Sequence, residues 1–72
     1  MKIEYFKDTD TLYISLSNKT SKESLEIKEG MVIDLDEDNK IVGIEIEHAS
    51  ENIEIDKLEI LRFPVLEKIA VA

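Results

Sequence analysis

The stretch from residue 31 to residue 50, MVIDLDEDNKIVGIEIEHAS, constrains the fold more than any other part of the chain. Apolar and polar residues alternate on both sides of a short polar run, which is typical of two strands joined by a turn. Asp and Asn suit that run because they tolerate positive φ and hydrogen-bond their own backbone. The stretch therefore predicts a β-hairpin. Its core-facing rows would be Met31, Ile33 and Leu35 in one strand and Val42, Ile44 and Ile46 in the other.

The same stretch matches the spacing of a calcium-binding loop. Carboxylates at alternate positions, followed by a glutamate, can gather the many oxygen ligands that Ca²⁺ requires. However, the flanks alternate as strands rather than helices, and Asn39 stands where such a loop carries glycine. A cation site in the acidic turn and a solvated polar turn both stay open, and the flanks favour the solvated turn. The candidate metal ligands are Asp34, Asp36, Asp38 and Glu45.

Alternation predicts further strands around the hairpin. Gly43, in the middle of a strand, predicts a bulge or a close neighbour. The polar run 18–24 predicts a loop, and residues 25–36 form either one long strand bent at Glu29 and Gly30 or two short strands. The complete set of strand predictions is 1–7, 11–17, 25–36 (whole or divided) and 41–47.

The pattern changes after residue 50. Residues 50–52 suit a turn or a helix N-cap, and the spacing of apolar residues predicts a helical turn at 57–61, with a strand over 58–62 as the alternative. Pro64 is placed to begin a helix that runs to about residue 70. We therefore expect one α+β, β-rich domain over 1–72. It would have an antiparallel meander sheet of four or five strands, covered on one face by a short C-terminal helical segment.

Size and charge narrow the classes of function. A chain of 72 residues buries a small core, so a homodimer is expected. The net charge of −8 disfavours nucleic acid and anionic membranes as partners and suits a basic protein partner. We expect a cytoplasmic protein, because the chain has no cysteine, no membrane-length apolar run and no signal-peptide pattern. The Lys- and Glu-rich composition without Gln or Cys resembles that of thermophile proteins.

Catalytic constellations are weak, so we expect a protein that is not an enzyme and needs no cofactor. His48 is the single histidine; it could pair with Glu47 for acid–base chemistry, but adjacent strand residues diverge, which favours a half-buried structural histidine. Ser15 and Ser17 lack a nearby base and an oxyanion hole. An enzyme with a site between subunits is the remaining catalytic alternative.

Tyr5 and Tyr13 are expected to stack across the first hairpin. The candidate interface aromatics are Tyr5, Tyr13 and Phe63.

Two patterns in the chain resemble a known family. The opening M-K-I-x-Y-x-x-x-x-D-x-L-Y-I-x-L-S and the later G-x-V-I-D-x-D-x-x-x-x-I-V-G-I-E-I-x-x-A-S are similar to the prokaryotic domain-of-unknown-function family 2283. The resemblance covers residues 1–50 in the correct order and spacing, with Phe6 and Asn39 as departures. It implies a compact β-rich domain without an established activity. Because some members are encoded beside small toxin-like proteins, it also implies an antitoxin-like or partner role.

Overall fold

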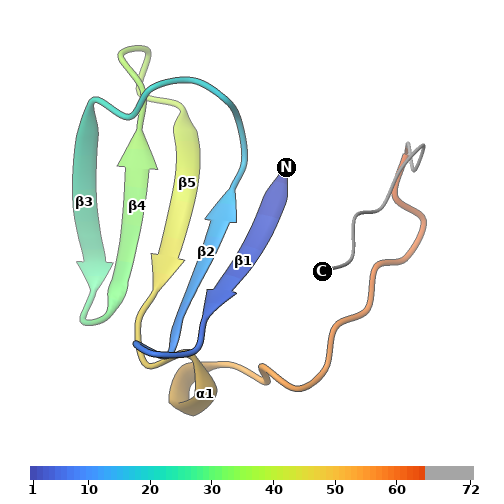
Figure 1. The fold of residues 1–72 in the computed structure, drawn as a ribbon. Helices are drawn as coiled ribbons and strands as arrows, with labels where there is room; N and C mark the ends of the chain where they lie inside the picture. Colours follow the sequence, from blue (N-terminus) through green and yellow to red (C-terminus); the bar gives the residue numbers. More distant parts are fainter. Residues whose placement is uncertain (65–72) are drawn as a thin grey trace.

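The computed structural model describes residues 1–64, which form one antiparallel sheet of five strands followed by one short helix (Figure 1). This confirms the expected β-rich, antiparallel fold. No helix among these residues is long and apolar enough to cross a membrane. The elements are β1 (Lys2–Phe6), β2 (Thr11–Ser15), β3 (Glu23–Lys28), β4 (Met31–Leu35), β5 (Ile41–Ile46) and α1 (Ala49–Asn52).

The predicted meander order is wrong. The strands lie side by side in the order β1-β2-β5-β4-β3, so the segment between β2 and β3 carries the chain across one end of the sheet to its far edge (Figure 1). A meander would put β3 at the centre. Every residue of β3 is exposed and the strand carries a bulge, features that suit an edge, whereas β5 is apolar and takes the centre.

The strand register divides the sheet into an apolar face and a polar face. One apolar residue from each strand falls in a single row across the whole sheet. Paired residues of antiparallel strands point to the same side, so this row defines the apolar face. The row reads Ile3, Ile14, Ile44, Ile33 and Leu25 from β1 to β3.

The buried core lies on this apolar face. Leu35, Val42 and Ile46 are buried there, as the hairpin pattern predicted, whereas Ile33 and Ile44 are only half-buried. No large side chain among residues 1–64 is fully buried. Such a sheet has one layer, whereas stable domains usually pack two.

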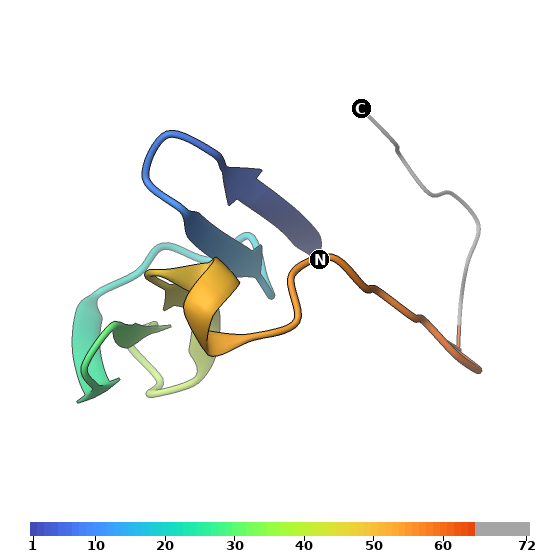
Figure 2. The same ribbon diagram turned by 90° about the horizontal axis from the view of Figure 1, so that it is seen from below.

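The helix of the structure begins earlier than predicted. Residues 57–61 form neither the predicted helical turn nor the alternative strand. A single helical turn needs tertiary packing to form, and Leu58 and Leu61 are 71% and 64% exposed. Figures 1 and 2 show the segment after α1 leading away from the sheet rather than covering a face. The predicted helix after Pro64 lies outside the described residues.

Candidate functional site

The polar face of the sheet carries a row of glutamates. Glu4 on β1, Glu45 on β5 and Glu26 on β3 occupy alternate strands of one cross-strand row, with Tyr13 and Val32 between them. Strands lie about 4.8 Å apart, so successive glutamates are spaced by roughly 10 Å. Glu4 and Glu26 are exposed and Glu45 is half-buried. The face is therefore an acidic surface that spans the full width of the sheet.

A hydrogen-bonded network crosses the polar face beside this row. The Tyr13 hydroxyl donates to Asp34 Oδ2 at 2.8 Å, and the Ser24 hydroxyl donates to Asp34 Oδ1 at 2.6 Å. The bond to Asp34 raises the pKa of Tyr13, because it stabilises the protonated phenol, and burial of the ring adds to the effect. The network therefore links β2, β4 and β3 on the polar face, and it passes over β5, which lies between β2 and β4.

Gly43 makes room for this network. A Cβ at residue 43 would collide with the hydroxyl and ring of Tyr13 and would lie 3.1 Å from Asp34 Oδ2. The ladder between β4 and β5 also shifts register at Asp34 and Leu35. The sequence predicted a bulge or a close neighbour at Gly43, and the structure has both: the register shift beside Gly43 and the Tyr13 side chain against it.

Asp36 organises the turn between β4 and β5. Its Oδ1 accepts hydrogen bonds from the amides of Asp38, at 2.8 Å, and Lys40, at 3.0 Å, while Asn39 adopts φ 62°. The bond from the Lys40 amide is the main cause that lowers the pKa of Asp36, because it stabilises the carboxylate. Asp36 is 4% exposed, and its Oδ2 is buried without a hydrogen-bond partner.

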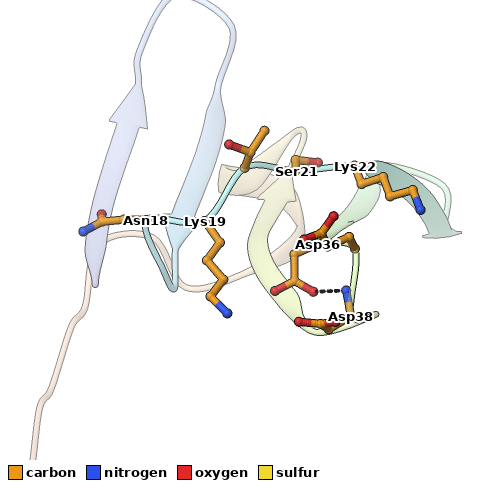
Figure 3. A pocket seen from close by; sticks show the side chains of 8 residues that line it. Asn18, Lys19, Ser21, Lys22, Asp36 and Asp38 are labelled. Atoms are coloured by element: carbon orange, nitrogen blue, oxygen red, sulfur yellow. Dashed lines mark hydrogen bonds between the residues drawn. The ribbon is translucent and has the colours of Figure 1, made fainter.

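A hollow opens between this turn and the loop after β2 (Figure 3). Figure 3 shows the Lys19 side chain on the same side as the carboxylate of Asp36, and the positive charge of Lys19 contributes to the lowered pKa of Asp36. The hollow therefore combines both signs of charge. Its lining residues are Asn18, Lys19, Thr20, Ser21, Lys22, Asp36, Glu37 and Asp38.

The four candidate metal ligands do not converge. Asp34 is engaged by Tyr13 and Ser24 on the polar face, and Asp36 by the amides of its own turn. Glu45 lies in the glutamate row. Within residues 1–64 no group of three or more acidic, histidine or cysteine side chains could hold a metal ion. Calcium binding by all four together is therefore not supported by their positions, and a cation site in the acidic turn stays a prediction.

A second network fastens α1 to the turn between β1 and β2. Asp10, at φ 54°, accepts a hydrogen bond from the Tyr5 hydroxyl at 2.7 Å and another from the Ser50 hydroxyl at 2.7 Å. The Ala49 amide donates to the Asp10 carbonyl at 2.8 Å, and Ala49 is fully buried. The bonds to the Asp10 carboxylate lower its pKa, with the Ser50 hydroxyl as the largest cause and the Tyr5 hydroxyl as the next.

Sequence reasoning missed this second network. The signal that could have found it is the resemblance pattern, in which Asp10 belongs to the opening and Ala49-Ser50 closes the later part. Tyr13, Asp34 and Gly43 belong to the same patterns, and they also meet in space. The residues of the two resemblance patterns thus include members of both polar networks.

His48 is exposed rather than half-buried, so that prediction is wrong. It sits at φ 50° before α1, where the left-handed backbone turns its side chain out of the strand, and its Nδ1 lies 3.6 Å from Glu51 Oε2 rather than pairing with Glu47. Both partners are more than 70% exposed, and such surface pairs contribute little. A shallow hollow beside it is lined by Phe6, Thr9, Thr11, Glu45, Glu47 and His48.

The expected stacking of Tyr5 and Tyr13 is also wrong. Tyr5 pairs with Leu12 and Tyr13 pairs with Glu4, so the two rings lie on opposite faces of the sheet. Tyr5 is 42% exposed, and Tyr13 and Phe63 are half-buried. The interface role of these three aromatics stays a prediction.

These observations define a small acidic protein built on one antiparallel sheet with two unlike faces. The model of DUF2283, a protein family of unknown function, matches residues 2–50, and the chain belongs to that family. An uncharacterised protein of Methanocaldococcus jannaschii is 36% identical over 62 residues, which covers 86% of this chain and 53% of the relative. The chain thus spans about half the length of that curated relative. No solved structure matches.

Proposed function

We propose that this protein is a non-enzymatic interaction module that binds a basic protein through the polar face of its sheet. The observation that carries the proposal is the glutamate row across β1, β5 and β3. Lys and Arg side chains of a partner can each approach one carboxylate of such a row, and the net charge of −8 attracts a basic surface from a distance. An antitoxin-like pairing with a small basic toxin is one form of this function.

The polar groups of the sheet support a binding role rather than catalysis. The carboxylates of Asp10, Asp34 and Asp36 accept hydrogen bonds that fasten strands, turns and α1. The histidine is exposed and faces another exposed side chain. A catalytic acid or base needs a cleft in which its pKa is tuned by burial and neighbours. Glu4 and Glu26, by contrast, are exposed and available for a partner.

Affinity capture from an extract of the native source, with the full chain immobilised, tests this function. We expect one basic protein in stoichiometric amount, released as salt is raised because the contact is electrostatic. The double variant Glu4→Gln/Glu45→Gln should lose most of that protein. The control Glu37→Gln/Glu54→Gln removes the same charge away from the face and should retain it. Equal capture by both variants, or capture of no stoichiometric basic protein, would reject the proposal.

A cation-binding function is the second candidate, and one observation favours it. The buried, unpartnered Oδ2 of Asp36 lies in the acidic turn, and a cation would supply a partner for it. Calorimetric titration with millimolar CaCl₂ checks this candidate. Heat that disappears in Asp36→Asn and persists in Glu37→Gln would support it. A titration of the unaltered chain without heat would eliminate it.

A further inference from the structure

The apolar face of the sheet is broad, continuous and almost free of charge. Beside the row that crosses all five strands, a second row runs through Tyr5, Leu12, Ile46 and Met31, and Leu16 pairs with Val42 on the same side. Charged side chains join these rows only at the ends of edge strand β3, where Lys28 pairs with Met31 and Glu23 with Leu35. We refer to this surface as the apolar face. It comprises Ile3, Tyr5, Leu12, Ile14, Leu16, Leu25, Met31, Ile33, Leu35, Val42, Ile44 and Ile46.

The described residues leave much of the apolar face in contact with solvent. Ile3 and Leu25, at its two edges, are 46% and 43% exposed, and Ile14, Ile33 and Ile44 are half-buried at its centre. Figure 1 shows helix α1 at one end of the sheet, and Figure 2 shows the segment that follows it leading away. Soluble proteins rarely leave so large a continuous apolar patch uncovered unless another molecule packs on it.

We infer that the apolar face is covered by the same face of a second copy of this chain, so that two sheets form the two layers of a sandwich. The charge distribution identifies this occupant. Two chains of net charge −8 repel each other, and close contact is least costly where their facing surfaces carry the fewest carboxylates. In the rows of the apolar face Glu23, at one end of β3, is the single carboxylate. Contact through the apolar face also keeps the glutamate row of each copy on the outside. A two-fold arrangement of one self-complementary patch closes the assembly at a dimer.

The area of the apolar face sets the strength of this dimer. A standard interface uses about 20–30 residues and about 800 Å² on each partner, so twelve residues scale to roughly 400 Å² for each copy. The total of roughly 800 Å² is below the size of stable specific interfaces and in the range of weak, transient ones. We therefore expect a weak, reversible dimer whose population depends on protein concentration.

Sedimentation equilibrium of the full chain, from about 10 µM to about 1 mM, tests the inference. Ile33 and Val32 offer a matched pair, because they are adjacent, aliphatic and half-buried but point to opposite faces. The unaltered chain should give a concentration-dependent dimer. Ile33→Ser should raise its dissociation constant about tenfold or more, since each copy loses an apolar contact, whereas Val32→Ser should leave it within about twofold. Leu25→Ser, at the exposed edge, gives the same test at less risk to folding.

Salt dependence separates this contact from the binding of a basic partner. Raising NaCl from about 50 mM to about 500 mM screens repulsion between the two acidic copies, so the dimer should tighten. The capture of a basic protein should weaken under the same change.

A monomer at every concentration would overturn the inference, as would equal weakening of the dimer by Ile33→Ser and Val32→Ser. In either case the capture experiment still decides the proposed function, because that function depends on Glu4 and Glu45.

Discussion

Asp10 and Ser50 lie 40 positions apart in the chain and are joined through both the hydroxyl and the amide of Ser50. The hydroxyl donates to Asp10 Oδ2 at 2.7 Å, and the amide donates to Asp10 Oδ1 at 3.1 Å. Helix α1 has four residues, too few to be stable by itself. Its position therefore depends on this contact and on the burial of Ala49.

Removal of the Ser50 hydroxyl should loosen α1. We expect Ser50→Ala to lower the free energy of unfolding by about 1 kcal/mol, the usual contribution of one hydrogen bond. Urea denaturation followed by circular dichroism measures the change. Ser21→Ala, in the exposed loop before β3, is the control and should leave the midpoint unchanged. Identical midpoints for the two variants would show that Ser50 does not fasten the helix.

A side chain at residue 43 should displace Tyr13 from Asp34. We expect Gly43→Ala to destabilise the fold by about 1–3 kcal/mol, as overpacking of a close contact does. Tyr13→Thr removes the ring that the new methyl group would meet. In that background Gly43→Ala should cost much less, and a double-mutant cycle of urea denaturations measures the coupling. Additive effects of the two substitutions would contradict the close contact of Tyr13 with Gly43.

Acid should weaken the turn that Asp36 organises. The pKa of Asp36 is lower in the folded protein than its usual value of 3.8, because the amides of Lys40 and Asp38 stabilise the carboxylate. The folded state thus holds this proton less tightly than the unfolded state. The contribution of the Asp36 carboxylate to stability is complete above the pKa of Asp36 in the unfolded chain. It is lost as the pH falls through the lower pKa of Asp36 in the folded protein. Urea denaturation between pH 7 and pH 2 should show this loss, and Asp36→Asn should show a smaller one. Parallel pH profiles would exclude Asp36 as the cause.

Alkali should break the bond between Tyr13 and Asp34. The pKa of Tyr13 is raised above its usual value of 10.0, because the phenol donates to Asp34. The contribution of this group is complete below pH 10 and is lost as pH rises through the folded pKa. Tyr13→Phe should remove this part of the alkaline destabilisation, whereas the loss that comes from Tyr5 should remain. Urea denaturation at pH 8 and near pH 11 checks the difference, and an unchanged loss in Tyr13→Phe would count against the bond.

The strands could be predicted because each one alternates within a few residues. The pattern of Met31–Leu35 and Ile41–Ile46 located the central hairpin, and its apolar rows share one face as expected. The strand order could not be predicted in this way, because alternation does not tell a strand which neighbour it pairs with. The error over Tyr5 and Tyr13 has a similar origin. A shift of one residue in a register moves a side chain to the other face.

The site was less predictable than the fold for a related reason. The spacing of Asp34, Asp36 and Glu45 suggested a shared ion. However, β4 ends at Leu35, so Asp36 lies in the turn and accepts from the amides of that turn, whereas Asp34 is held on the sheet by Tyr13. The networks of Asp10 and Tyr13 join residues far apart in the sequence, so local patterns do not show them. The segment after α1 has apolar residues that suit either helix or strand, and without packing neither forms there.

The central position of β5 has a consequence for the order in which the protein folds during its synthesis. β1 with β2 and β3 with β4 can pair as soon as each hairpin leaves the ribosome, because both are local. Isolated two-stranded hairpins are marginally stable in water. The strand that joins them is translated last, and it pairs with β2 on one side and β4 on the other. A nascent chain whose residues 41–46 have not yet left the ribosome can therefore form at most two separate hairpins, and the sheet becomes a cooperative unit only when β5 is released.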